Sequence, residues 1–158
     1  MADYLGQELQ KLLDQYDEQR RATLAREEKV KEEDAQFVAA FAELRRSVIR
    51  PAFERAAAML AARGHKVSVT EQEFSVDAHK KVNEAGIFIH VVPAGTQSTV
   101  PDEKGRALSI STRFYNKSVW ISTGRPQEVA KGSYRIDQIS REFVEEELVR
   151  FFAGVVAG

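Results

Sequence analysis

Asp34–Gly64 reads DAQFVAAFAELRRSVIRPAFERAAAMLAARG and carries the longest apolar-striped helical pattern of the chain. Its apolar residues recur every three or four positions, which is the spacing of one helix face. The stripe consists of Phe37, Phe41, Leu44, Val48, Ile49, Phe53, Ala56 and Leu60. Pro51 removes one backbone hydrogen bond, but the stripe keeps its phase across it, and Gly64 suits the left-handed end of a helix. We therefore expect one helix, kinked at Pro51, that organises the rest of the chain.

The residues before this stretch predict a charged helical arm at 1–33, followed by an α+β domain at 34–158. Between Asp3 and Glu33 the chain has no proline and one glycine, and good helix formers dominate. Apolar residues at coiled-coil spacing begin the arm and then give way to charged ones. They are Leu5, Leu9, Leu12, Leu13 and Tyr16. Three interpretations stay open: a solvated helix folded back on its own domain, self-association through these residues as a coiled coil, or a disordered arm.

The run Glu27–Asp34, EEKVKEED, joins the arm to the organising stretch. Such a charge run is typical of a solvated helix face. The Asp34 carboxylate suits the start of a new helix, because it can accept hydrogen bonds from free backbone N–H groups. The pattern therefore leaves open whether one helix continues through this run or a second helix begins there.

After Gly64 the apolar period changes from that of a helix to that of a strand. Two alternating pairs of opposite phase follow, namely Val67 with Val69 and Phe74 with Val76. This change of phase predicts a bulge or a break near residues 71–72, because both pairs need to face the core. Residues 77–86 resemble a connection, and residues 87–92 predict a strand with apolar side chains on both faces.

The second half of the chain predicts a meander and a closing helix. Residues 107–115 alternate with Phe114 on the inner face, a tight turn is expected at Asn116 and Lys117, and strands through 119–121 and 130–136 follow. Ser140 can cap a final helix whose apolar stripe faces the core. The predicted fold is α+β: a long helical N-terminal half packed on a four- or five-stranded antiparallel meander sheet and closed by a C-terminal helix.

Composition excludes several classes of function. The chain of 158 residues has a formal net charge of -1 and no cysteine, so it has no disulfides, no thiolate metal sites and no thiol nucleophile. The N-terminus lacks the apolar core of a secretory signal, and no window approaches the roughly 20 apolar residues of a membrane helix. We expect a soluble, cytoplasmic protein with no contact to membranes. His65, His79 and His90 lack metal-ligand spacing, so we predict no metal and no cofactor.

A basic face of the predicted sheet is the candidate binding site. Residues 104–136 contain seven Lys or Arg side chains against one Glu. The expected pairing places Arg113 opposite Trp120, Tyr115 opposite Ser118 and Trp120 opposite Lys131. The candidate ligand-binding residues are Phe88, His90, Arg113, Tyr115, Trp120, Lys131 and Arg135. Basic side chains also commonly cover an exposed aromatic ring without any ligand, and the arm could bury Trp120 instead.

These patterns favour a non-enzymatic protein-interaction or self-association module that uses the helical arm and one sheet face, with a homodimer through the N-terminal helix. The alternative is a binder of an anionic ligand or single-stranded nucleic acid on the basic face around Trp120. An enzyme with a cleft under the Pro93–Arg106 loop is the least favoured reading, because the chain has no GxSxG, P-loop or GxGxxG motif and offers no catalytic residues.

Overall fold

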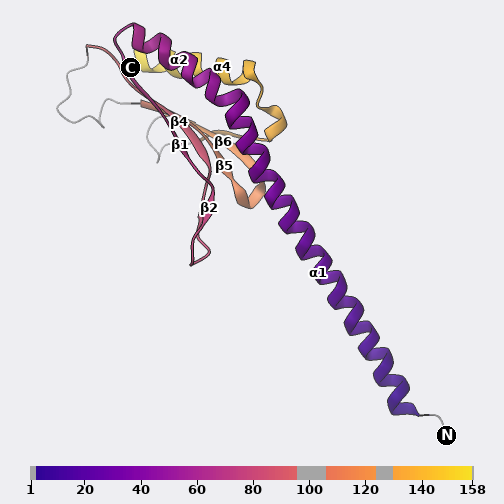
Figure 1. The fold of residues 1–158 in the computed structure, drawn as a ribbon. Helices are drawn as coiled ribbons and strands as arrows, with labels where there is room; N and C mark the ends of the chain where they lie inside the picture. Colours follow the sequence, from indigo (N-terminus) through magenta and orange to yellow (C-terminus); the bar gives the residue numbers. More distant parts are fainter. Residues whose placement is uncertain (1–2, 96–105, 124–129, 158) are drawn as a thin grey trace. The chain divides into compact units, whose positions relative to one another are not determined.

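The computed structural model of the chain describes residues 3–95, 106–123 and 130–157. It confirms the α+β class: helical elements precede a five-stranded antiparallel sheet, and a C-terminal helix follows it (Figure 1). The chain divides into two compact units, Met1–Gln36 and Phe37–Gly158. The second unit contains the sheet and the core.

The first helix, α1, spans Tyr4–Leu44. Its first turn is capped, since the Asp3 carboxylate accepts the backbone N–H of Gly6 at 3.1 Å. The charged run at 27–34 belongs to the interior of α1, so Asp34 does not begin a new helix. Glutamate, lysine and arginine are good helix formers, so a run of them can continue a helix without interruption.

A π-helix at Arg45–Ile49 separates α1 from α2, which spans Arg50–Ala62. This π-helix lies directly before Pro51, where the sequence predicts a kink. The backbone N–H of Arg50 donates to the carbonyl of Arg45, five residues earlier. Because Pro51 has no N–H and its ring crowds the carbonyl four residues before it, a wider turn just ahead of the proline carries the helical chain past it.

The π-helix turns Arg45 into the protein, where only 7% of the residue is exposed. Its guanidinium donates to the carbonyl of Gln72 at 3.0 Å and lies 2.8 Å from a Glu73 carboxylate oxygen. Arg50 lies 2.8 Å from Glu71 on the same strand. Its hydrogen bond to Glu54, together with that to Glu71, raises the pKa of Arg50 above its ordinary value. Arg45 and Arg50 therefore connect the π-helix and the start of α2 to β1 through a hydrogen bond and an ion pair.

The large sheet has the strand order β1-β4-β5-β6-β7, and every pairing is antiparallel. Its strands are β1 (Lys66–Gln72), β4 (Gly86–Val92), β5 (Arg106–Arg113), β6 (Ser118–Thr123) and β7 (Ala130–Tyr134). β4 to β7 form the predicted meander. β1 joins its edge beside β4, because the chain between these two strands leaves the sheet and returns.

That excursion is a small hairpin of β2 (Ser75–Val76) and β3 (Val82–Asn83). The predicted bulge or break near residues 71–72 is a break, because β1 ends at Gln72 and the phase changes between two separate strands. Phe74 instead packs against Phe114, with ring centroids 4.8 Å apart. Asp77 closes the hairpin by accepting the backbone N–H groups of His79 and Lys81.

The predicted register between β5 and β6 is shifted by two residues. Ser118 lies opposite Arg113 rather than Tyr115, and Trp120 lies opposite Ser111. The connection is a 3-10 turn, η2 (Phe114–Asn116), closed by Lys117 in the left-handed conformation, and it uses more residues than a two-residue hairpin turn. A shift of two keeps every side chain on its predicted face. Phe114, in contrast, leaves the strand and is not an inner-face strand residue.

The pairing of β6 with β7 also differs from the prediction. Trp120 lies opposite Ser133 rather than Lys131, and the register shifts between Ile121 and Ser122, which pair with Gly132 and Ala130. Lys131 is therefore the additional residue of a bulge. The alternation of a strand does not reveal such an insertion, because one extra residue is absorbed locally.

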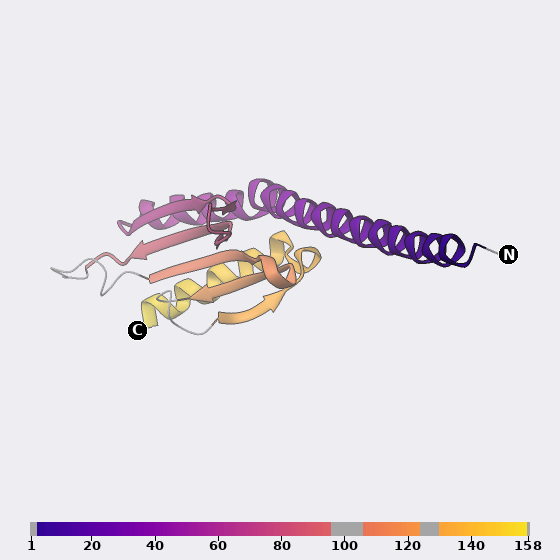
Figure 2. The same cartoon turned by 90° about the horizontal axis from the view of Figure 1, so that it is seen from below.

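The core lies between the helices and one face of the sheet. Phe41, Ile49 and Phe53 bury their side chains against inner-face strand residues that include Ile87, Ile89, Leu108, Ile110, Val119 and Ile121. The closing helix α4, Arg141–Ala157, is capped by Ser140 as predicted, since its hydroxyl accepts the N–H of Phe143 at 3.1 Å. Both α2 and α4 lie on this face (Figures 1 and 2). The opposite face of the sheet carries four of the predicted binding residues, Phe88, His90, Arg113 and Trp120.

Candidate interaction surfaces

The outer face of the sheet brings together part of the predicted site. Arg113 and Trp120 are diagonal neighbours on adjacent strands, and the guanidinium carbon lies 4.1 Å from the centroid of the indole ring. Phe88 and His90 lie on the same face of β4, both half-buried. The ring of Phe88 leans over Gly86, where an added Cβ would come within 3.1 Å of it. These four residues form one surface.

Trp120 is covered on one face by Arg113. In the described part of the chain, neither the indole Nε1 of Trp120 nor the Nε of Arg113 has a hydrogen-bond partner, and both atoms are buried. The stacked pair thus holds two N–H donors that are shielded from water. A base or anion that used them would have to displace the guanidinium or stack on its far side, so this surface is a stacked pair rather than an open platform.

The remaining predicted binding residues lie elsewhere. Tyr115 belongs to the η2 turn and is 76% exposed. Arg135 follows β7 and pairs with Asp137 at 3.0 Å, and its backbone N–H donates to Gln138. The backbone of Lys131 is part of β7, but its side chain lies outside the described ones, as do residues 96–105 of the loop expected to cover a cleft. The structure thus brings together four of the seven candidates, Phe88, His90, Arg113 and Trp120.

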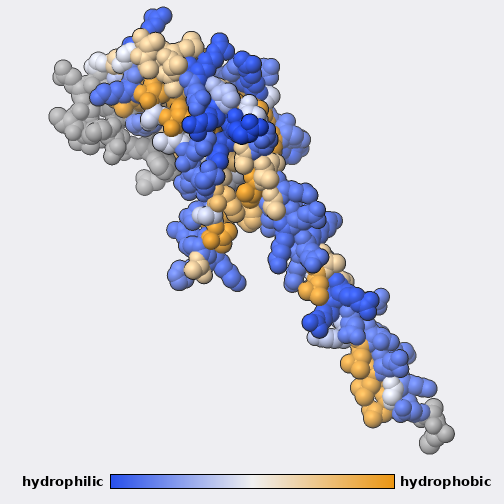
Figure 3. Space-filling view, viewed as in Figure 1, coloured by the Kyte–Doolittle hydropathy of each residue, from blue (hydrophilic) through white to orange (hydrophobic). Residues whose placement is uncertain are grey.

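The predicted interaction residues of the arm lie on exposed parts of α1. Leu5, Leu9, Leu12, Leu13 and Tyr16 have 46% to 68% of their surface exposed. At 100° per residue they cover one side of the helix, which we call the arm stripe. Its nearest charged neighbours around the helix are Glu8 on one flank and Asp17 on the other. Figure 3 shows apolar side chains gathered near the N-terminal end of α1.

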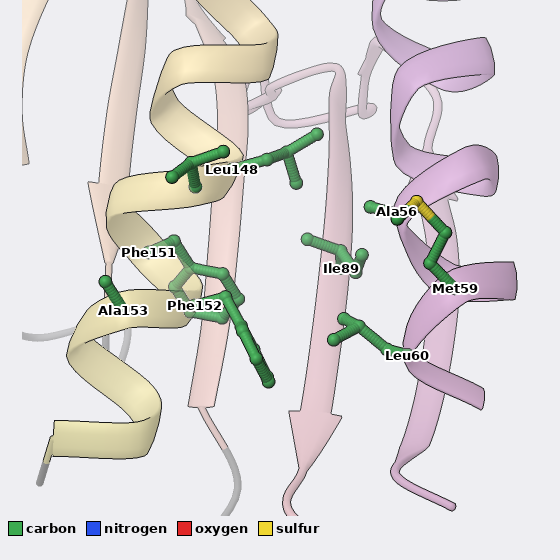
Figure 4. Close-up of a pocket in the computed structure, with 9 residues that line it drawn as sticks. Ala56, Met59, Leu60, Ile89, Leu148, Phe151, Phe152 and Ala153 are labelled. Atoms are coloured by element: carbon green, nitrogen blue, oxygen red, sulfur yellow. The ribbon is translucent and has the colours of Figure 1, made fainter. Parts of the chain in front are cut away.

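A groove between α2 and α4 was not predicted. It has a volume of about 350 Å³ and apolar walls only (Figure 4). Ala56, Met59 and Leu60 of α2 form one wall, Leu148, Val149, Phe151, Phe152 and Ala153 of α4 form the other, and Ile89 of β4 lies at the bottom. The sequence signal for it is weak but present: Met59 and Val149 are apolar, lie outside the core stripes of their helices, and are strongly exposed.

Charge is unevenly distributed around this α2–α4 groove. Arg55 and Arg63 lie four residues before and after Met59, so they border it on the rim of α2, and both are exposed. On the rim of α4, Glu145 and Glu146 lie four and three residues before Val149, and Glu145 is paired with Arg141 at 3.0 Å. The α2 rim is therefore basic, whereas the α4 rim carries carboxylates.

Two absences hold within residues 3–95, 106–123 and 130–157. No three His, Asp or Glu side chains of this part of the chain are placed to hold a metal ion together. Among the helices in the same residues, none combines the length and the apolar character needed to cross a membrane.

The chain matches no family model, no curated protein and no solved structure.

Proposed function

We propose that the protein is a non-enzymatic interaction module that self-associates through the arm stripe. The exposure of this stripe on α1 carries the proposal. Scattered exposed leucines are common on protein surfaces, but five large apolar side chains on one side of the first turns of a helix form a continuous surface. Such a stripe is typical of helices that bind another helix or a groove.

The energetics favour a covered stripe. Burying a leucine or a residue of similar size stabilises by about 1.5–3 kcal/mol. Five such side chains on each copy offer enough to offset the roughly 4–15 kcal/mol that association costs in lost translational and rotational freedom. A single helix that packs against nothing is also only marginally stable in water, since most helical stability in proteins comes from packing.

Sedimentation or light scattering of the full chain tests this proposal. We expect a mass above that of the 17.8 kDa monomer at micromolar concentration. The variant Leu5→Glu with Leu12→Glu should be monomeric under the same conditions, because it places two charges in the stripe. The matched control is Gln7→Glu with Gln10→Glu, which adds the same charge to other sides of the same turns and should keep the wild-type mass.

The proposal fails if the wild-type chain is monomeric at all accessible concentrations, or if both double variants lower the mass equally. The second result would assign the effect to net charge and not to the apolar surface. Urea unfolding of each variant confirms that the second unit remains folded.

A second candidate function is binding of an anionic ligand or single-stranded nucleic acid at Arg113 and Trp120. The stacked guanidinium and indole favour it, because both groups stack on bases and the guanidinium pairs with phosphate. Against it stand the enclosed N–H donors of the pair and the ion pair that already engages Arg135. This function ranks second for that reason.

Trp120 is the only tryptophan of the chain, so its fluorescence reports this site alone. Titration with oligothymidylate and with inorganic phosphate should change the emission in a salt-sensitive manner if the site binds them. The variant Arg113→Ala should remove the response, whereas Arg135→Ala should keep it. An absent response, or one that survives Arg113→Ala, excludes this function.

A further inference from the structure

We propose that the arm stripe of one copy docks into the α2–α4 groove of a second copy. This inference rests on the proposed function and names the surface that receives the stripe. Each copy of the chain carries one apolar helix stripe and one apolar groove, both exposed. Two copies therefore hold equal numbers of the two surfaces, and an exchange of arms covers all of them.

The chemistry of the groove selects an aliphatic occupant. Its walls are almost entirely apolar, so a polar ligand would lose its contacts with water and gain few in return. The volume of about 350 Å³ lies near the lower end of the ~300–1,000 Å³ of ligand pockets, which suits a few branched side chains. Leu5, Leu9, Leu12 and Leu13 have the i, i+4, i+7 and i+8 spacing with which an amphipathic helix anchors in such a groove.

Charge complementarity favours the groove over a second arm. Residues 4–18 contain Glu8, Asp14, Asp17 and Glu18 against Lys11 as the single cation. Pairing two arms would bring these acidic segments together, and like charges at a helix interface are unfavourable. The α2 rim of the groove presents Arg55 and Arg63 instead. Because Glu8 and Asp17 lie on opposite flanks of the stripe, an arm in the groove brings one of them to the α2 rim, near these arginines.

The length of the stripe supports the same choice. Its regular apolar spacing covers about two heptads and then meets Gln19 and Arg26, whereas a stable coiled coil needs about three to four heptads. A groove formed by two helices and a strand surrounds each leucine more completely than a single partner helix does. A short stripe therefore gains more apolar contact in the groove.

The test uses the full chain with the groove variant Val149→Glu. Val149 is 70% exposed, so the new carboxylate stays solvated in the free protein but would be buried by a docked arm. The matched control is Val76→Glu in β2. It makes the same substitution at a valine that is 53% exposed and lies outside the groove. We expect Val149→Glu to raise the dissociation constant of the assembly at least about tenfold, equivalent to 1.4 kcal/mol, and Val76→Glu to leave it unchanged.

Mixing supplies a second readout. The stripe variant Leu5→Glu with Leu12→Glu retains an intact groove, and Val149→Glu retains an intact stripe. A mixture of the two should form a heterodimer that neither variant forms alone. In addition, Arg55→Glu with Arg63→Glu should weaken association, and adding either Glu8→Lys or Asp17→Lys, the one on the flank that faces α2, should restore part of it.

The outcomes separate the two proposals. If Val149→Glu associates like the wild type while the stripe variant is monomeric, arms pair with arms: the proposed function stands and this inference is wrong. If the wild type itself is monomeric, both are wrong. Failure of the mixture and of the charge exchange to restore association also contradicts docking in the groove.

Discussion

The guanidinium of Arg45 donates to the backbone carbonyl of Gln72 across 3.0 Å and so ties the π-helix to the end of β1. Arg45 also contacts Glu73 and lies 3.6 Å from Glu71, while 8% of its side chain is exposed. Arg45→Ala would remove a charge-assisted hydrogen bond from the Gln72 carbonyl and the ion pair with Glu73, whose side chain is 75% exposed. We expect a loss of about 1.5–3 kcal/mol in the free energy of unfolding, measured by urea denaturation.

Arg46 provides the comparison for Arg45, because it is also an arginine of the π-helix and is paired with a glutamate, Glu43. Its side chain is 72% exposed, so Arg46→Ala should change stability by less than about 1 kcal/mol. Equal losses for the two variants would contradict the structural role of Arg45.

Arg113→Ala should expose one face of Trp120 to water. We expect a red shift of the tryptophan emission and a loss of about 0.5–1 kcal/mol in stability, the usual contribution of a cation stacked on an aromatic ring at a partly exposed site. Arg135→Ala should leave the emission unchanged, since this side chain pairs with Asp137. An unchanged spectrum in Arg113→Ala would contradict the stacking.

Helix content should depend on protein concentration if the arm stripe is covered by a second copy. On dilution, the first turns of α1 lose their packing partner and fray, so the ellipticity per residue at the helix minimum should weaken. The variant Leu5→Glu with Leu12→Glu should show the same low value at every concentration. A wild-type signal that does not change across the dissociation range would contradict coupling between association and arm structure.

Ser140→Ala should destabilise the second unit by about 1 kcal/mol, because the N–H of Phe143 loses its acceptor at the start of α4. Ser140→Asp retains a capping oxygen and should restore most of the stability. Thermal or urea unfolding measures both. If alanine and aspartate behave alike, the cap contributes nothing.

The elements of this fold were predictable, because each depends on a local period. The helical stripe around Phe41 and Phe53, the alternation of Ile87 and Ile89, and the cap at Ser140 all describe neighbours along one segment. The α+β class and the meander follow from them. Side chains of the predicted outer face, such as Trp120, also lie on that face despite an incorrect register, since the slip was by two residues.

Features that depend on non-local contacts were not predictable. The register of β6 depends on whether the chain turns through a tight pair or a 3-10 turn, and Phe114 is compatible with both. Arginine is usually an exposed residue type. The burial of Arg45 depends on the π-helix and on the carboxylates of Glu71 and Glu73, which lie in another segment. No sequence motif marks the groove. Met59 and Val149 line the same groove only because their two helices lie on the same sheet.

The apolar walls of the groove have a thermodynamic consequence. Water displaced from such walls gives association a negative heat-capacity change, so the enthalpy of binding becomes more favourable on warming. Apolar contacts also weaken on cooling. An assembly that covers Ile89, Phe152 and their neighbours should therefore loosen in the cold and tighten toward physiological temperature, the opposite of a contact maintained by ion pairs alone.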